Sequence, residues 1–169
     1  MKRILFSLAM ALVAITGFSQ KYALIDTRYI LDKLPEYKQA QKSLDSIAAD
    51  WQKDIDTKQA TLDKMYKDYD AEQVMLSDEL KKKREDQLYN KEKELRDLQR
   101  KRFGFEGDLF KKRQELVKPI QDRVYNAVQR ISVARGYDLV LDKSEGITVI
   151  FADPKLDRSD DVLRNLGVK

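Results

Sequence analysis

The feature that most restricts the fold of this chain is a heptad repeat of apolar residues over residues 37–76. Nine of the twelve positions spaced alternately by four and three residues are apolar, whereas an overall apolar content of 42% would give about five. Such a repeat favours a long helix packed along a second helix, because its apolar side chains form one continuous seam. The seam positions are Tyr37, Gln41, Leu44, Ala48, Trp51, Ile55, Lys58, Leu62, Met65, Tyr69, Glu72 and Leu76.

A second seam with the same period runs over residues 88–116. Pro119 is then expected to interrupt or kink the helix, because its ring removes one backbone hydrogen bond. Beyond it an apolar stripe continues to Gly136, a predicted C-cap. The positions of the second seam are Leu88, Lys91, Leu95, Leu98, Arg102, Phe105, Leu109, Lys112 and Leu116.

The two seams predict an antiparallel helical hairpin, and the chain offers two places for its turn. A turn near residue 76 gives arms of equal length, 36–75 and 78–117, whereas a turn near residue 104 leaves much of the first seam without a partner. We therefore predict the tip near residues 75–78.

Local signals support the turn near residue 76. Ser77 is expected to cap the second arm, and Asp78 and Glu79 follow in its first turn, where the helix dipole favours acids. Gly104 and Gly107 then form a weak point within this arm, since each glycine costs up to ~1 kcal/mol relative to alanine.

Segments with strand character lie at both ends of the hairpin. Residues 21–26 and 137–142 predict strands, and ITVIFA at 147–152 predicts another. A short helix over 27–34 is expected to be capped by Thr27 and ended by Pro35, and a last helix is expected over 160–166. The fold class is therefore α+β and predominantly α, with a long helical hairpin and a small β body.

The first nineteen residues have the layout of a secretory signal peptide. Lys2 and Arg3 precede an apolar run from Ile4 to Ile15, and cleavage is expected after Ser19. The alternative is a retained anchor, but about fifteen apolar residues span only ~22 Å of a ~30 Å hydrocarbon core. The expected segments are 1–19 as signal peptide, 20–35 as first strand and short helix, 36–118 as hairpin, and 119–169 as return helix, two strands and C-terminal helix.

The predicted body is too small to be stable alone. Three short strands in about fifty residues bury little surface, and the chain has no cysteine to form disulfides. Continuous apolar runs without polar alternation favour a sheet shared between several copies of the chain. The expected oligomerisation residues are Leu24, Ile25, Leu139, Val140, Leu141, Ile147, Val149 and Ile150.

The composition argues against catalysis. The chain has neither cysteine nor histidine, so thiol chemistry, the usual general base and the commonest metal ligand are missing. The acidic segment DPKLDRSDD at 153–161 lacks the glycine and the glutamate of a calcium-binding EF-hand loop, and a turn followed by a helix cap explains it. We expect no enzyme activity, no cofactor and no metal.

The order of these segments resembles the Skp/OmpH family of periplasmic chaperones. The resemblance rests on the export signal, the strand KYALID, a charged hairpin with an LSDE turn, VKPIQDRV, GYDLVLD and a final helix DVLRNL. It implies a homotrimer, in which three helical tentacles leave a small β-barrel body and enclose unfolded outer-membrane proteins without ATP. Gly104 and Gly107 in the second arm depart from the rigid tentacle that the resemblance implies.

The residues expected to bind such clients lie at the hairpin tip and along its arms. The cations beside the tip are also expected to attract acidic clients, anionic lipid or lipopolysaccharide, at about 1 kcal/mol per residue near a charged membrane. The alternative is that the apolar tip residues close the coiled coil and the cations only keep it soluble. The candidate residues are Val74, Met75, Leu76, Lys81, Lys82, Lys83, Arg84, Tyr66, Tyr89, Phe103 and Phe110.

Charged residues within the seams leave two interpretations open. They either loosen the hairpin so that it can open around a client, or they point outward and pair with opposite charges. These residues are Lys58, Glu72, Lys91, Arg102 and Lys112. For the seam aromatics Trp51 and Phe105 we predict a role in core packing.

The sequence therefore favours an ATP-independent periplasmic holdase for unfolded outer-membrane proteins. A structural coiled-coil adaptor or spacer of the cell envelope is the alternative. Such a spacer would be expected to have an uninterrupted apolar seam, whereas both seams here contain charged residues. Nucleic acid is not an expected partner, because acids balance the cations within the same helices.

Overall fold

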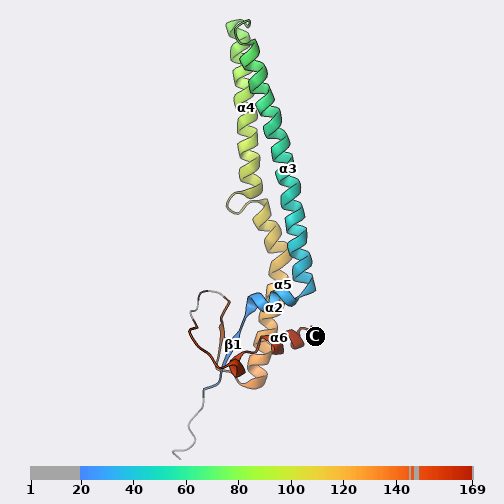
Figure 1. Ribbon diagram of the computed structural model, residues 1–169, viewed down its shortest axis with the longest axis vertical. Coiled ribbons are helices and arrows are strands. Elements are labelled where there is room, and N and C mark those ends of the chain that lie inside the picture. Colours follow the sequence, from blue (N-terminus) through green and yellow to red (C-terminus); the bar gives the residue numbers. More distant parts are fainter. Residues whose placement is uncertain (1–19, 145, 147–148, 169) are drawn as a thin grey trace, which may run out of the picture. The chain divides into compact units, whose positions relative to one another are not determined.

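The computed structural model describes residues 20–144, 146 and 149–168. The predicted signal peptide at 1–19 and the predicted contact residue Ile147 lie outside the described residues. The chain divides into two compact units, which we call the hairpin unit, Leu34–Asp122, and the body unit, formed by the described residues of Met1–Lys33 and Arg123–Lys169. The predicted class, predominantly helical with a small sheet, is confirmed (Figure 1).

The hairpin unit begins with the long helix α3, Pro35–Glu72. Leu34 has an extended backbone, with φ −81° and ψ 120°, because the proline ring disfavours a helical residue before it. The chain reverses over residues 73–77, and α4, Asp78–Phe103, returns along α3 (Figure 1). The Ser77 side chain accepts a hydrogen bond from the backbone N–H of Leu80, so the predicted N-cap is confirmed.

The seam of the hairpin is closed by a small apolar cluster. Ile55 and Leu62 of α3 and Leu88 and Leu95 of α4 are buried, and Met65, Tyr69 and Leu98 pack against them. All seven residues lie at predicted seam positions, because the heptad repeat places one face of each helix toward the other.

The second arm is not one helix. A loop of residues 104–107 separates α4 from α5, Asp108–Arg135 (Figure 1). The prediction that Phe105 packs in the core is wrong, since this side chain is 98% exposed. The loop also changes the helical phase, so that Val117 is buried while the predicted seam residue Leu116 is only half-buried.

Helix α5 continues through Pro119 without an interruption in its helical residues. It begins in the hairpin unit and ends in the body unit. Gly136 terminates it with a φ of 65°, and the N–H of Tyr137 donates to the carbonyl oxygen of Ser132 at 2.9 Å, so the predicted C-cap is confirmed.

The body unit contains a parallel sheet of two strands, β1, Tyr22–Ile25, and β2, Leu139–Asp142. Tyr22 pairs with Leu139, and the register continues to Ile25 and Asp142. On its other edge β1 forms an isolated bridge between Leu24 and Asp157. Both edges of β1 are therefore occupied within the chain.

Three short helices complete the body unit: α2, Thr27–Lys33; a 3₁₀ helix η1, Pro154–Leu156; and α6, Ser159–Asn165. Helices α2 and α6 pack together. The apolar core of this unit consists of Ala23, Leu24, Ile25, Ile30, Val124, Ala127, Val162 and Leu163.

Two expectations for the body unit need correction. Asp26, rather than Thr27, caps α2, because its carboxylate accepts a hydrogen bond from the N–H of Tyr29 at 2.9 Å, while the Thr27 hydroxyl bonds to Asp142. Residues 149–152 of the predicted strand ITVIFA are irregular. In this single chain the segment has no neighbouring strand to pair with among the described residues.

Candidate functional site

The tip of the hairpin presents apolar side chains to solvent. Val74 and Met75 are 87% and 82% exposed, whereas Leu76 is half-buried. Leu80, which sequence analysis did not select, is 49% exposed. Two of the three predicted apolar tip residues are thus largely exposed, and the third is only partly accessible.

The four predicted cations next to the tip differ in their surroundings. Arg84 lies 3.6 Å from the carboxylate of Glu72 on the opposite arm, and Lys81 lies 4.0 Å from Asp78. Lys82 and Lys83 are exposed and have no carboxylate partner among the described residues. Only part of the cluster is therefore free to attract an anionic partner.

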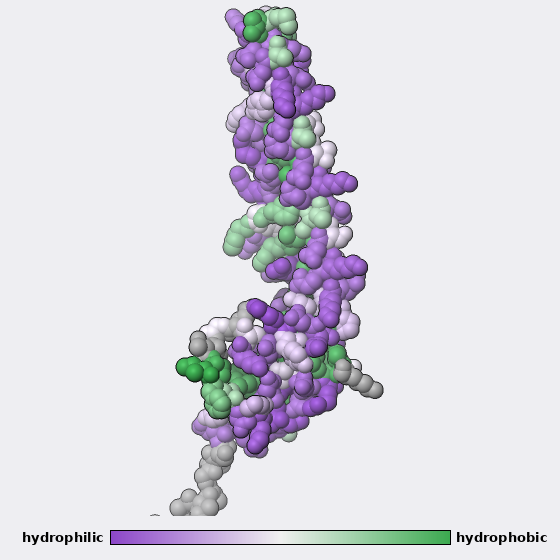
Figure 2. All heavy atoms as spheres, in the orientation of Figure 1, coloured by the Kyte–Doolittle hydropathy of each residue, from purple (hydrophilic) through white to green (hydrophobic). Residues whose placement is uncertain are grey.

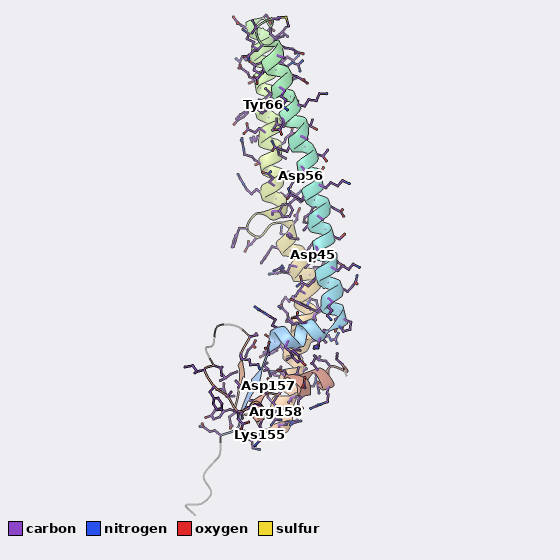
Figure 3. All side chains as sticks on the ribbon, in the orientation of Figure 1. Asp45, Asp56, Tyr66, Lys155, Asp157 and Arg158 are labelled. Atoms are coloured by element: carbon purple, nitrogen blue, oxygen red, sulfur yellow. The ribbon has the colours of Figure 1, made fainter. Side chains whose placement is uncertain are left out.

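Tyrosines of the first arm bond to carboxylates of the second. The hydroxyl of Tyr66, labelled in Figure 3, donates to Glu92 at 3.2 Å, and that of Tyr69 donates to Glu85 at 2.6 Å. Loss of hydration and the Glu92 carboxylate raise the pKa of Tyr66, while the hydrogen bond to Glu85 raises the pKa of Tyr69. Tyr89 is 60% exposed and is the most accessible of the predicted arm tyrosines.

The charged residues of the seams are all paired with opposite charges. Glu72 pairs across the hairpin with Arg84, and Arg102 pairs with Asp108 across the loop. The three lysines pair within their own helices, Lys58 with Asp54, Lys91 with Glu94 and Lys112 with Glu115. This arrangement favours the second interpretation above, in which the seam charges are satisfied rather than left to loosen the hairpin.

A groove of 520 Å³ lies between the two arms. Its floor is apolar, and the paired charges of Lys58 and Lys91 stand at its rim. Threonine side chains add methyl groups, because the hydroxyls of Thr57 and Thr61 donate to backbone carbonyls one turn earlier. The apolar floor consists of Leu62, Met65, Leu95 and Leu98.

The loop between α4 and α5 is fixed by a cluster around Trp51. The guanidinium carbon of Arg102 lies 4.5 Å from the centroid of the Trp51 ring, and its Nη1 lies 2.7 Å from Asp108. Phe103 meets the same indole edge to face, with 6.3 Å between ring centroids. Trp51 thus contributes to packing, as predicted, and α3 holds the end of α4.

One phenylalanine lies in this loop and two lie in the helices next to it, all with part or all of their side chains exposed, and we call these three residues the phenylalanine surface. Phe103 is 39% exposed, Phe110 45% and Phe105 98%. Figure 2 shows hydrophobic side chains gathered at this level of the hairpin. The sequence predicts client contacts for Phe103 and Phe110 but a core position for Phe105. The available signal was its position between Gly104 and Gly107.

A network of polar residues joins the ends of the two strands in the body unit. Asp142 accepts hydrogen bonds from Thr27 and from the N–H of Ser144, and Asp157 (Figure 3) bonds to Lys143 at 2.7 Å and to Ser159. Partial burial raises the pKa of Asp142 and of Asp157, but these hydrogen bonds outweigh it, so the net shift of each is downward. The network fastens the strand ends to the start of α6.

The predicted oligomerisation residues divide into buried and accessible ones. Leu24 and Ile25 are only 7% and 6% exposed, so residues of the same chain already cover them. Leu139 is 46% exposed on β2, and Ile150 is 95% exposed. Val140, Leu141 and Val149 are half-buried. Phe151, which sequence analysis missed, is 85% exposed beside Ile150.

Neither a metal-binding cluster nor a membrane-spanning helix is present among the described residues. No group of three or more acidic, histidine or cysteine side chains is arranged to hold a metal ion there. In the same part of the chain, no helix combines the length and apolarity needed to cross a bilayer.

Comparison with known proteins identifies the family. No curated protein sequence matches this chain. A solved structure described as a candidate outer membrane chaperone (OmpH-like) from Caulobacter crescentus CB15 has the same fold, with a TM-score of 0.70 and 15% sequence identity over 89% of this chain and 85% of that one. The model of the OmpH-like outer membrane protein family matches residues 21–166. Because this match spans nearly all of the described residues, the chain belongs to the OmpH-like family.

Proposed function

We propose that this protein is an ATP-independent holdase chaperone of the periplasm that keeps unfolded outer-membrane proteins from aggregating. Membership of the OmpH-like family and the OmpH-like structural neighbour support a chaperone role. The observation that carries the proposal is the exposure of large apolar side chains along a charged hairpin whose own core is small. These side chains are Val74, Met75, Leu80, Tyr89, Phe105 and Phe110.

The mechanism follows from how these contacts are distributed. Each exposed side chain offers at most about 1.5–3 kcal/mol on burial, and contacts spread over both arms can form and break one at a time. An unfolded client is then held by many weak apolar and electrostatic contacts. Transfer to a more favourable folding site releases it, so that no nucleotide is required.

The holding mechanism needs a cavity, and we propose that three copies of the chain form it. The outer edge of β2 has no neighbouring strand among the described residues of one chain, and Ile150 and Phe151 are exposed. Parallel sheet edges and apolar side chains of this kind are stable when another chain covers them. Since Leu24 and Ile25 are already covered, the proposed contacts are Leu139, Val140 and Ile150.

Two measurements on the purified protein test this proposal. The native mass from sedimentation equilibrium should be three times the chain mass. Dilution of a urea-denatured outer-membrane β-barrel protein should give less light scattering in its presence, without nucleotide. A folded monomer would contradict the trimer, and unchanged aggregation of the β-barrel protein would contradict the chaperone activity.

Anionic lipid or lipopolysaccharide is a second proposed partner of the tip. Val74 and Met75 of the tip are exposed, as are Lys82 and Lys83 near the start of α4, and an apolar tip followed by lysines fits a lipid–water interface. Sedimentation with vesicles that contain phosphatidylglycerol checks this partner. Lys82→Glu combined with Lys83→Glu should abolish binding, and vesicles of phosphatidylcholine alone should not bind.

A structural adaptor of the cell envelope is the alternative function. The pairing of every charged seam residue favours a hairpin that keeps its shape, as a spacer requires. A spacer would bind one defined partner and would leave the aggregation of unfolded β-barrel proteins unchanged. The light-scattering measurement therefore separates the two functions.

A further inference from the structure

The phenylalanine surface is held in place by the fold rather than left loose. The N–H of Gly104 donates to the carbonyl of Arg100 at 2.8 Å, and the N–H of Gly107 donates to that of Gly104 at 2.9 Å. The ion pair between Arg102 and Asp108 ties the end of α4 to the start of α5. The chain thus holds Phe105 in solvent on an ordered loop.

The two glycines are required for this loop. A Cβ at Gly104 would lie 2.3 Å from the carbonyl oxygen of Arg100, and a Cβ at Gly107 would lie 2.8 Å from that of Lys101. Between them Glu106 adopts a φ of 53°, in the left-handed region that few residues other than glycine occupy. A backbone this constrained, which exposes a phenylalanine at 98%, indicates a contact with a partner.

The charges around the loop restrict the chemistry of that partner. Arg100 and Lys101 on α4 and Lys111 and Arg113 on α5 are exposed and have no carboxylate partner within the described part of the chain. Asp108 at the start of α5 is already paired with Arg102, and the loop itself carries one acid, the exposed Glu106, against these four cations. A partner that carries carboxylates would meet four unpaired cations next to three aromatic rings.

The shape of the phenylalanine surface restricts the kind of partner further. In Figure 1 the loop bulges outward from the helices of the hairpin unit. An exposed side chain on a convex loop is buried only by a partner that wraps around it or brings a matching pocket. A flexible polypeptide segment can wrap around the loop without a preformed pocket.

We propose that the phenylalanine surface is a binding site for unfolded polypeptide segments that combine aromatic side chains with Asp or Glu. This inference rests on the proposed chaperone function and assigns a principal contact to the loop between α4 and α5. The aromatic rings stack on Phe103, Phe105 and Phe110, while the carboxylates pair with the flanking cations. Segments of the same hydrophobicity that carry Lys or Arg are disfavoured by repulsion.

Fluorescence anisotropy with three labelled, unstructured peptides tests the proposal. The first carries several Phe and Asp residues, the second has Ser in place of each Phe, and the third has Lys in place of each Asp. We expect the full-length protein to bind the first peptide about tenfold more tightly than either of the others, and raised salt to weaken this binding. Equal affinity for the first and third peptides would overturn the proposal.

Matched variants locate the site. Phe105→Ser should weaken binding of the first peptide about tenfold, the effect of losing one buried aromatic ring, whereas Val74→Ser at the exposed tip should weaken it clearly less. The double variant Lys111→Glu, Arg113→Glu should weaken it more than Lys82→Glu, Lys83→Glu. Equal losses at the loop and the tip would contradict the assignment. Circular dichroism of Phe105→Ser should match wild type, because the side chain has no packing role.

The light-scattering measurement on the same samples separates this inference from the function on which it rests. If the wild type protects the β-barrel protein while Phe105→Ser and Val74→Ser bind the first peptide equally well, the loop is not the site and the chaperone function stands. If the wild type binds the first peptide selectively through Phe105 but gives no protection, the site stands and the holdase function is wrong.

Discussion

The guanidinium of Arg102 lies over the indole ring of Trp51, 4.5 Å from its centroid, and joins the end of α4 to the middle of α3. The same guanidinium bonds to Asp108 at 2.7 Å with only 30% of its side chain exposed. One residue of the second seam therefore serves two contacts at the place where the second arm is interrupted. A planar guanidinium can stack on the ring and bond to the carboxylate at once, which an ammonium group cannot.

Removal of this side chain should destabilise the hairpin unit. We expect Arg102→Ala to lower the free energy of unfolding by about 1–2 kcal/mol, because both a cation–π contact and a half-buried ion pair are lost. Chemical denaturation followed by circular dichroism measures the change. In a double-mutant cycle with Trp51→Leu, a coupling energy of about zero would show that the stacking contributes nothing.

The Ser77 cap should contribute measurably to the turn at the tip. Ser77→Ala is expected to cost about 1 kcal/mol in free energy of unfolding, because the N–H of Leu80 loses its acceptor. Ser46→Ala, the same chemical change at an exposed position inside α3, is the control and should be neutral or slightly stabilising. A cost at position 77 no larger than that at position 46 would contradict the cap.

The loop at 104–107 should be intolerant of a side chain at its first residue. Gly104→Ala places a Cβ 2.3 Å from a backbone oxygen, and we expect it to lower the free energy of unfolding by about 1–3 kcal/mol. Glu106→Gly relieves a positive φ, so its stability should stay within about 1 kcal/mol of wild type. Thermal unfolding measures the stability of both variants. If Gly104→Ala were as stable as wild type, the loop would have to rearrange freely to accept the added Cβ.

Acid should weaken the body unit through Asp142 and Asp157. Because both carboxyl groups have a lowered pKa in the folded state, they stabilise the fold above the ordinary pKa of 3.8, and this stabilisation is lost as the pH falls further. Denaturant unfolding at neutral pH and near pH 3 should show the loss. Asp142→Asn should show less of it, whereas Asp86→Asn, at an exposed position on α4, should behave like wild type.

Thr27 does not cap α2 but takes part in the polar network of the body unit. Thr27 donates its backbone N–H to Asp142 at 3.1 Å, and its hydroxyl lies 2.7 Å from that of Ser144. The sequence pattern suggested a local cap, which needs only neighbouring residues. The observed partners lie more than a hundred residues away, so only the folded chain brings them together.

The sequence by itself determined the hairpin. A heptad seam, an N-capping serine at Ser77 and arms of equal length are local signals, and Ile55, Leu62, Leu88 and Leu95 lie where the repeat placed them. Helix periodicity depends on the backbone geometry alone, so it can be read without knowing the partner helix. The predominantly helical class followed from the same signals, and the small sheet followed from the apolar runs at 21–26 and 137–142.

Only the tertiary structure decided how the second arm is interrupted at residues 104–107 and which segments of the body unit pair as strands. The heptad extended through Phe105, but two close backbone approaches at Gly104 and Gly107 end the helix there and turn this side chain outward. In the body unit the predicted strand 147–152 is irregular over its described residues 149–152, because a strand exists only where another strand pairs with it. The strand depends on a partner distant in sequence. The loop depends on backbone approaches between neighbouring residues and on the contacts of Trp51 with Arg102 and Phe103, which a helical period does not contain.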